Sequence, residues 1–244
     1  MFNFKITIEY DGTNYVGWQR QDNGMSIQEA IENAIFKLSG EKVNIFGAGR
    51  TDAGVHALGQ VAHFSLIKEF KTDNIRDGIN QYLRPQPIAI LDVKLVDKNF
   101  HARFTAKKRT YKYLLTNRRS PLTINQNKSW VVFKPLDIIK MKLESKNFIG
   151  KHNLEAFRSI HCQSNSAIKT IDNIIIINEN NDIIITVSAK SFLHSQVRIM
   201  VGTLVEIGKG KITESINEII QKEKRPQAGI TAPACGLYLI KVEY

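Results

Sequence analysis

The sequence predicts an α+β protein made of two lobes with antiparallel sheets, divided near residue 105. Three observations lead to this prediction. The 244 residues can form one large domain or two of roughly 100 to 150 residues each. The composition, with 43% hydrophobic and 23% charged residues, is that of an ordinary globular protein. Both halves mix strand patterns with amphipathic helix patterns, so we expect lobes at residues 1–105 and 106–244.

In the first half, apolar or alternating runs bounded by turn residues predict strands, at residues 4–12, 44–50, 59–66 and 88–96. Two helices are expected between them. The first, residues 26–40, has Ser26 as its N-cap, Glu29 three residues later and Gly40 past its end. The second, residues 74–85, is stopped by a proline.

The second half shows the same mixture of elements. A strand pattern, TYKYLLT, opens it at residues 110–116. A helix at 135–150 and a hairpin at 173–190, turning at Asn180 and Asn181, are expected next. The remaining elements are a strongly apolar helix, a short helix and a closing strand, at residues 191–208, 213–222 and 236–244.

Net charge is the unusual feature of the composition. The formal charge is +11 and the isoelectric point about 9.6, which favours a polyanionic partner. Membrane lipid is the weaker candidate, because no apolar run approaches the ~20 residues of a spanning helix. The first residues run straight into a strand pattern without the apolar core of a signal peptide, so we expect a cytoplasmic protein.

The positive charge is concentrated in one basic stretch, residues 98–136, which contains no Asp or Glu. Its ten cations are Lys98, Arg103, Lys107, Lys108, Arg109, Lys112, Arg118, Arg119, Lys128 and Lys134. Aromatic residues are interleaved with them, namely Phe100, Phe104, Tyr111, Tyr113, Trp130 and Phe133. Cations that bind phosphates and rings that stack on unpaired bases are typical of RNA contact. A solvated basic face over core aromatics explains the composition equally well.

Metal, disulfide and cofactor chemistry find no support in the sequence. Cys162 and Cys235 are far apart and form no C-x-x-C motif. None of the six histidines belongs to an H-x-x-x-H pair with a nearby acid. We therefore expect neither a metal nor a cofactor.

A glycine-rich loop, GAGRTDAGVHALGQ at residues 47–60, resembles a phosphate-binding loop but fails both common patterns. The dinucleotide fingerprint started at Gly47 would need a glycine where Asp52 stands. A P-loop started at Gly49 would need its lysine where Val55 stands. A carboxylate among backbone N–H groups would also repel phosphate. We therefore infer that the glycines shape the loop around the aspartate and not around a phosphate.

Two interpretations of Asp52 stay open at this point. It could cap a helix beginning near Ala53, as loop carboxylates commonly do. Alternatively it is a functional carboxylate, with the cation of Arg50 close by and glycines that let another molecule approach. Arg198 raises a parallel question, because it lies within the apolar stripe of the helix predicted at 191–208. It either emerges on the polar face or meets a carboxylate, and Asp52 is the one without an explanation.

With Asp52, Tyr111 and Arg198 singled out, the sequence resembles the tRNA pseudouridine synthases of the TruA family over nearly its whole length. The most specific motif is GRTDAGVHA. The others, in order, are YDGTNYVGWQRQ, SIQEAIENAI, NFHARFTAKKRTYKYLL, SFLHSQVRIMVGTLVEIGKG and APACGLYLIKVEY. The chain departs from the family pattern at Asn153, Leu154 and Lys169.

The resemblance implies two RRM-like lobes joined across a central basic cleft. It also implies a homodimer that binds the anticodon stem-loop of tRNA and isomerises uridine to pseudouridine at positions 38, 39 and 40. Asp52 would be the catalytic aspartate, and Tyr111 would stack on the target base and be able to act as a base. Arg198 would pair with the aspartate, Arg50 would help to turn out the nucleotide, and Leu193 would line the pocket.

This isomerisation breaks the N1–C1′ bond and rejoins the base through C5, so it needs no cofactor. It does need an ionised carboxylate, which an arginine partner would stabilise. Two other functions compete with it. A non-catalytic RNA-binding protein would need the basic aromatic residues but not the carboxylate. A nucleoside hydrolase would use Asp52 on C1′ and release free uracil.

Overall fold

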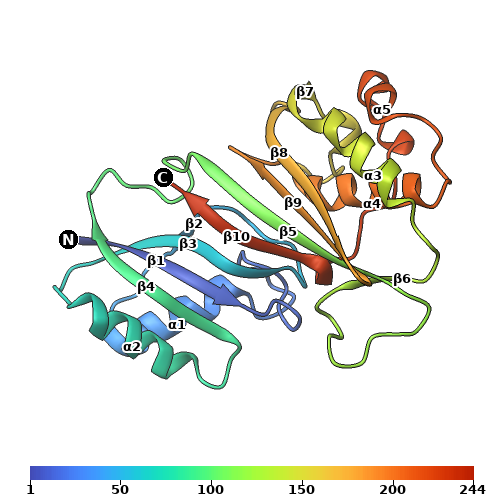
Figure 1. Ribbon diagram of the computed structural model, residues 1–244. Coiled ribbons are helices and arrows are strands. Elements are labelled where there is room, and N and C mark those ends of the chain that lie inside the picture. The colour runs from blue at the N-terminus through green and yellow to red at the C-terminus, as the bar shows by residue number, and fades with distance from the viewer. The chain divides into compact units, whose positions relative to one another are not determined.

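The computed structural model describes residues 1–244 and divides into two compact units. The first comprises residues 1–107 and 238–244, the second residues 108–237. Both combine α-helices with mostly antiparallel strands (Figure 1). None of the helices has the length and hydrophobicity needed to span a membrane.

The first unit is a sheet with two helices on one side of it (Figure 1). The strand order is β4-β1-β3-β10, and β2 pairs with β3. The elements are β1 (Phe2–Tyr10), α1 (Ile27–Ser39), β2 (Phe46–Gly47), β3 (His56–Leu66), α2 (Thr72–Leu83), β4 (Ile88–Val96) and β10 (Leu237–Glu243). β1 is antiparallel to both β3 and β4, and its inward side chains form the core with the apolar faces of α1 and α2.

The end of the chain differs from the division expected at residue 105. The sequence places the closing strand in the lobe at 106–244, whereas residues 238–244 belong to the first unit. β10 pairs in parallel with β3, with Tyr238 opposite His56 and Leu239 opposite Ala57. Strand pairing across so much sequence leaves no local pattern, which is why the closing strand was placed with its sequence neighbours.

The caps of α1 are confirmed. The Ser26 hydroxyl accepts a hydrogen bond from the Glu29 N–H at 3.1 Å, and Gly40 ends the helix in the left-handed region at a φ of 76°. The strand expected at 44–50 is much shorter, because only Phe46 and Gly47 pair with β3 before the chain turns away.

The second unit is an antiparallel sheet in the order β5-β9-β8-β7, with β6 parallel to β5. Its strands are β5 (Lys108–Asn117), β6 (Trp130–Val132), β7 (Gly150–Asn153), β8 (Ile168–Glu179) and β9 (Asp182–Ala189). Its helices are α3 (Ile138–Ser145), α4 (Gln196–Gly208) and α5 (Ile216–Lys222). Four short 3-10 turns occur at Lys146–Phe148, Glu155–Phe157, Arg225–Gln227 and Ala234–Gly236.

The hairpin at 173–190 is confirmed as β8 and β9, with Asn180 at a φ of 58° in its turn. Two helix predictions were too long. The segment at 135–150 forms α3, a 3-10 turn and the start of β7. The apolar helix expected from residue 191 begins only at Gln196, because Ser195 adopts a left-handed φ of 56° and the five residues before Gln196 are irregular.

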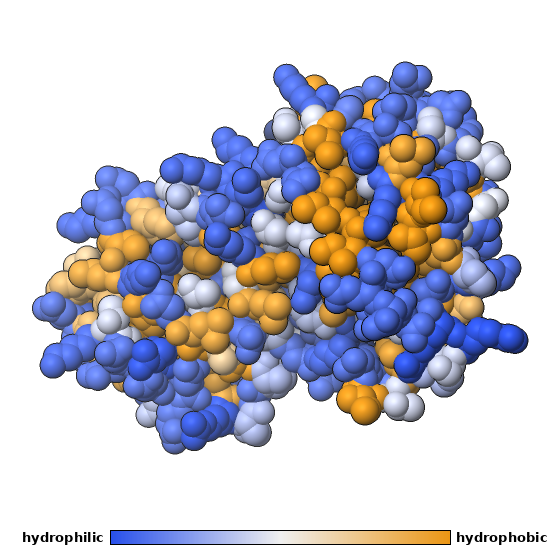
Figure 2. All heavy atoms as spheres, in the orientation of Figure 1, coloured by the Kyte–Doolittle hydropathy of each residue, from blue (hydrophilic) through white to orange (hydrophobic).

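The interleaved aromatics of the basic stretch divide into buried and exposed rings. Tyr111 and Tyr113 point into the core of the second unit, whereas Phe104 and Phe133 are 73% and 56% exposed. Other apolar side chains are also exposed, including Ile139 of α3 and Ile175 of β8. Figure 2 shows apolar surface gathered over β8 and α3.

A segment at residues 228–232 packs along α4 by direct backbone contact. The Gly229 N–H donates to the Thr203 hydroxyl at 2.9 Å, and the Ala232 N–H donates to the Arg198 carbonyl at 3.1 Å. A Cβ built on Gly202 would lie 1.8 Å from the Ile230 carbonyl oxygen. The glycine of α4 therefore sets how closely this segment approaches the helix.

Gly202→Ala should destabilise the protein by about 3 kcal/mol or more, because a backbone carbonyl cannot move aside as a side chain can. Gly208→Ala in the same helix is the matched control, since its Cβ would meet side-chain rather than backbone atoms, the nearest being Met141 Sδ at 2.7 Å. We expect that change to cost no more than about 1 kcal/mol. Urea unfolding of both variants measures the difference, and equal losses would contradict this packing.

Candidate active site

Asp52 lies in a tight turn between β2 and β3. The Val55 N–H donates to the Asp52 carbonyl at 3.1 Å, and Gly54 has a φ of 78°, as the third residue of a type II turn requires. No helix begins at Ala53, because the chain enters β3 at His56. The interpretation of Asp52 as a helix N-cap was therefore wrong. Its side chain is half-buried.

The loop that follows β1 holds the residue before Asp52 from one side. The Trp18 N–H donates to the Thr51 carbonyl at 3.0 Å, and the Tyr10 hydroxyl lies 2.8 Å from the Thr51 hydroxyl. Gly17 has a φ of 111°, and a Cβ there would stand 2.6 Å from the Thr51 carbonyl oxygen. The two loops thus meet backbone against backbone at the position next to the carboxylate.

A second contact fixes the loop where it enters β3. The Gly12 N–H donates to Nδ1 of His56 at 3.1 Å. Asp11 Oδ1 lies 3.0 Å from the same nitrogen and would accept its proton in the charged form. The His56 ring is 1% exposed and stacks on Tyr238 at a centroid distance of 4.7 Å. The turn carrying Asp52 is therefore anchored to buried structure at its far end.

Arg50 lies on the incoming side of the same loop. The Gln60 amide donates to the Gly49 carbonyl at 2.8 Å, and the Ala48 N–H donates to the Val61 carbonyl at 2.7 Å. These bonds tie the residues before Arg50 to β3 and leave its side chain exposed. Arg50 and Asp52 thus come from one loop held on both sides.

Sequence reasoning did not assign a role to the residues that hold this loop. Gly12, Gly17 and Trp18 act through contacts with Val55, Thr51 and His56, which lie more than 30 positions away in the sequence. One signal was available in the sequence. Gly12 and Gly17 lie at or just after the end of a predicted strand, and because glycines cost conformational entropy, they indicate a place where another part of the chain comes close to the backbone.

Tyr111 lies on β5 in the second unit, opposite Val187 of β9. It is 8% exposed, and its ring meets Phe192 edge-on at a centroid distance of 5.3 Å. Tyr113, two residues along the strand, is fully buried, and its hydroxyl donates to the Pro233 carbonyl at 2.8 Å. Burial raises the pKa of Tyr113.

Leu193 belongs to the irregular segment that leads into α4. It is 4% exposed, its N–H donates to Gln196 Oε1 at 2.7 Å, and its carbonyl accepts from the Gln196 N–H at 3.2 Å. The side chain and backbone of Gln196 therefore fold this lead-in back onto the first turn of the helix.

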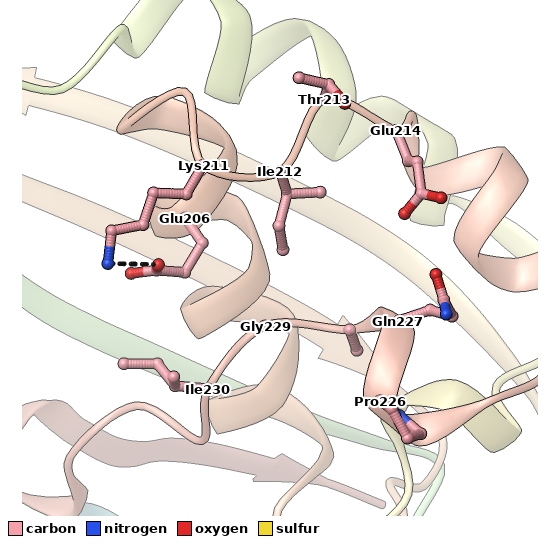
Figure 3. A pocket seen from close by; sticks show the side chains of 10 residues that line it. Glu206, Lys211, Ile212, Thr213, Glu214, Pro226, Gln227, Gly229 and Ile230 are labelled. Atoms are coloured by element: carbon pink, nitrogen blue, oxygen red, sulfur yellow. Dashed lines mark ion pairs between the residues drawn. The ribbon is translucent and has the colours of Figure 1, made fainter.

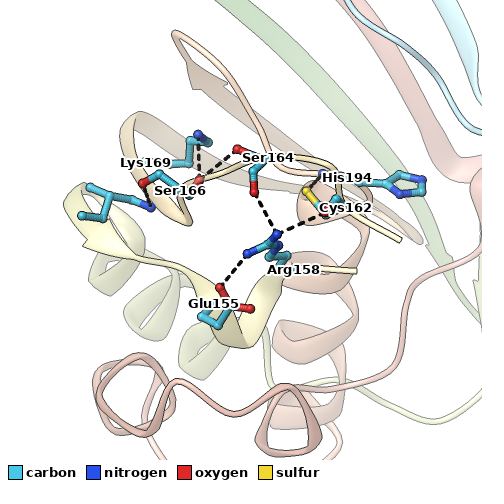
Figure 4. A network of polar contacts seen from close by, with 8 residues as sticks. Glu155, Arg158, Cys162, Ser164, Ser166, Lys169 and His194 are labelled. Atoms are coloured by element: carbon cyan, nitrogen blue, oxygen red, sulfur yellow. Dashed lines mark hydrogen bonds and ion pairs between the residues drawn. The ribbon is translucent and has the colours of Figure 1, made fainter. Parts of the chain in front are cut away.

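A network of polar contacts around Arg158 supports the same lead-in (Figure 4). The Arg158 guanidinium donates to Glu155 Oε2 at 3.1 Å and to the carbonyls of Cys162 and Ser164 at 3.1 and 2.8 Å. The loop shaped in this way meets His194, whose N–H donates to Cys162 Sγ at 3.4 Å. Arg158 thus orders a loop that contacts the residue after Leu193.

Arg198 lies in the first turns of α4 and is half-buried. Its Nε donates to the Ala232 carbonyl at 2.7 Å, so the plane of its guanidinium is fixed by the segment that packs along the helix. The predicted site residues therefore form two sets. Arg50 and Asp52 lie in the first unit, and Tyr111, Leu193 and Arg198 lie in the second.

Asn153 and Leu154 precede the Arg158 network in the sequence. Asn153 ends β7, and its Oδ1 is buried without a hydrogen-bond partner. Leu154 is fully buried, and the Lys169 ammonium donates to the Ser166 carbonyl at 3.2 Å.

A cavity of about 370 Å³ lies elsewhere in the second unit (Figure 3). Two of its charged lining residues, Glu206 and Lys211, are 3.1 Å apart, and Glu206 also lies 2.9 Å from Lys209 outside the cavity. The third, Glu214, pairs with Lys222. Burial alone would raise the pKa of Glu206, but the two lysines outweigh it and lower that pKa. None of the predicted site residues lines this cavity. No cluster of three or more His, Cys, Asp or Glu could hold a metal ion.

Gly17→Ala should cost about 2 to 4 kcal/mol of unfolding free energy, because left-handed strain adds to a clash with the Thr51 carbonyl. Gly40→Ala is the matched control: its φ is 76°, but a Cβ there meets nothing within 4 Å. It should cost only the strain, about 1 kcal/mol. Hydrogen exchange at the Trp18 amide should accelerate in Gly17→Ala alone, and an unchanged rate would contradict the contact.

Comparison with known proteins gives a consistent picture. A family model described as tRNA pseudouridine synthase matches residues 6–105 and 145–244. The protein named tRNA pseudouridine synthase A of Wolbachia pipientis wMel is 53% identical over 243 residues, covering 99% of both chains. Proteins of the same name from Ehrlichia chaffeensis and Afipia carboxidovorans are 52% and 45% identical, over 99% and 100% of both chains.

The chain also aligns with part of a crystal structure of a Cbf5-Nop10-Gar1 complex, at 10% identity and a TM-score of 0.37, covering 97% of this chain and 48% of the other. That likeness is too low to support an argument. The family match spans most of both structural units, including the loop of Asp52 and the helix of Arg198. This chain belongs to the tRNA pseudouridine synthase family.

Proposed function

We propose that the protein is an isomerase that converts uridine to pseudouridine in tRNA, with Asp52 as its catalytic carboxylate. The observation that carries this proposal is the Asp52 turn. Two loops meet there backbone against backbone, and a half-buried carboxylate is held beside their junction. Membership of the family identifies the reaction that a carboxylate in this loop would perform.

The reaction is an intramolecular rearrangement. The N1–C1′ bond breaks, the uracil turns, a C5–C1′ bond forms, and C5 then loses its proton while N1 gains one. An ionised Asp52 would attack the nucleoside covalently or support departure of the base. No atom enters and no electron is transferred, so the chain's own side chains suffice for the chemistry.

The other roles are proposed from the resemblance, and local geometry supports them. Tyr111 stacks on the target base and takes the C5 proton, and its ring is already held edge-on by Phe192. Arg198 pairs with Asp52, and Ala232 fixes its orientation. Leu193 lines the base pocket.

Arg50 would fill the space that the flipped nucleotide leaves, and its exposed side chain suits that role. Flipping costs a few kcal/mol, which stacking and backbone contacts must offset.

The finer assignments belong to the same proposal. We propose the anticodon stem-loop as substrate, uridines 38, 39 and 40 as targets, RRM-like lobes and a homodimer. In support of the lobes, each unit is a mostly antiparallel sheet with helices packed against it. In support of an RNA partner, the net charge is +11. Sedimentation equilibrium tests the dimer, and a monomer at micromolar concentration would contradict it.

The direct test uses a tRNA transcript with tritium at C5 of its uridines, without added cofactor. The wild type should release tritium into water and no free uracil. Asp52→Asn should reduce the rate by roughly a thousandfold or more while still binding tRNA. Asp22→Asn, which removes an exposed carboxylate from the same unit, is the control and should retain full activity.

Tritium release by Asp52→Asn at the wild-type rate would remove Asp52 from the mechanism. Free uracil would identify a hydrolase, and tight binding without release would identify an RNA-binding protein.

Tyr111→Phe tests the base. Its single-turnover rate should fall by roughly a hundredfold, because the hydroxyl that accepts the C5 proton is lost while the ring still stacks. Tyr113→Phe is the control. It loses a hydrogen bond worth about 1 kcal/mol of stability but should react at the wild-type rate per folded molecule. Equal rates for Tyr111→Phe and the wild type would assign proton removal to another group.

A further inference from the structure

A group of stacked rings lies on the first unit, outside the residues proposed for catalysis. We call it the ring cluster, and its members are Phe46, His63, Phe100, His101 and Phe104. Phe46 stacks on His63 at 5.3 Å and meets His101 at 5.8 Å. His101 meets Phe104 at 4.3 Å. The rings come from β2, β3 and the start of the basic stretch.

The cluster is buried at its base and open at its ends. His63 is 8% exposed, whereas Phe46 and Phe104 are 50% and 73% exposed. Burial of apolar area therefore does not explain the two phenylalanines, since most of the Phe104 ring is in water. An exposed pair of rings on an ordered base is the arrangement of a stacking platform.

Hydrogen bonds fix the Phe104 backbone before any partner arrives. His101 Nδ1 accepts from the N–H groups of Arg103 and Phe104, at 3.2 and 3.4 Å. The Thr105 N–H donates to the His101 carbonyl at 3.0 Å. At the base, His63 Nδ1 accepts from the Ala102 N–H at 3.2 Å. The same Nδ1 lies 3.3 Å from the Phe46 carbonyl. Burial and the neighbouring His101 lower the pKa of His63.

Cations lie close to the rings. The Arg103 guanidinium lies 5.6 Å from the Phe104 centroid, and Lys5 lies 5.9 Å from that of Phe100. Lys98 and Lys107 flank the segment, and no acidic residue follows until after position 136. The nearest acid in sequence, Asp97, is occupied in accepting from the Asn99 N–H at 2.8 Å. The cluster thus combines rings that can stack on bases with cations that can bind phosphates.

We propose that Phe46 and Phe104 form a stacking site for an unpaired base of the tRNA, separate from the target uridine. The inference rests on the proposed function for the identity of the RNA. β3 connects the two places: His56 lies at the Asp52 end, and His63 opposes Phe46. Seven residues of strand span about 23 Å, so the base bound here is several nucleotides from the one that reacts. The site therefore positions the RNA rather than taking part in the chemistry.

The test is the affinity for an unmodified tRNA transcript, measured by fluorescence anisotropy over a series of salt concentrations. Phe104→Ala should weaken binding roughly five- to a hundredfold at every salt concentration, because stacking depends little on counterions. Phe104→Tyr keeps the ring and should bind like the wild type. Lys107→Ala should instead lower the salt slope by about one.

Phe36→Ala is the matched control, because it removes a ring that is 45% exposed from α1. It should leave both affinity and tritium release unchanged. The stacking site would be wrong if Phe104→Ala bound tRNA as tightly as the wild type, or if it lost no more affinity than Phe36→Ala. It would also be wrong if the loss came with a changed salt slope. If Phe104→Ala lost affinity for a protein partner but kept its affinity for tRNA, the stacking site would also be wrong.

The two proposals fail differently. If the wild type releases no tritium, the proposed reaction is wrong, but the comparison of Phe104→Ala with Phe104→Tyr still decides whether a ring stacks on RNA. If the wild type is active and Phe104→Ala has the KM of the wild type for tRNA, only the stacking site is wrong.

Discussion

The position of Asp52 depends on the backbone contact between the loop after β1 and the turn before β3. The hydrogen bond from the Trp18 N–H to the Thr51 carbonyl, at 3.0 Å, forms only because Gly17 has no side chain to separate the two loops. A hydrogen bond of this kind contributes about 1 kcal/mol. Its larger effect is geometric, since it fixes the residue that precedes the carboxylate.

In the second unit, too, a close backbone contact permitted by a glycine positions a proposed functional residue. Arg198 is oriented by Ala232, in a segment that reaches α4 because Gly202 leaves room for it. Leu193 is held by Gln196, and the Arg158 network orders the neighbouring loop. Arg50, Asp52 and Leu193 thus lie on short irregular segments that hydrogen bonds fasten to a strand or helix, whereas Tyr111 lies on β5 and Arg198 in α4. Such segments combine the reach of a loop with the precision that catalysis needs.

The sequence predicted what local chemistry determines and missed what distant contacts determine. The caps of α1 and the β8–β9 hairpin follow from Ser26, Gly40 and Asn180, and the structure confirms them. The start of α4 was placed too early because the apolar pattern continues through residues that Ser195 turns out of the helix. Asp52 could be singled out by the failure of two phosphate-loop patterns, but its support by Gly17 could not, since no local pattern encodes that contact.

The most direct measurement of the central claim is the single-turnover rate of Gly17→Ala on saturating tRNA, expressed per folded molecule, together with its affinity for tRNA. If the loop contact positions Asp52 for chemistry, the rate should fall by roughly tenfold or more while the affinity stays close to that of the wild type. A wild-type rate would contradict the account, because the carboxylate would then act without the contact that is said to hold it.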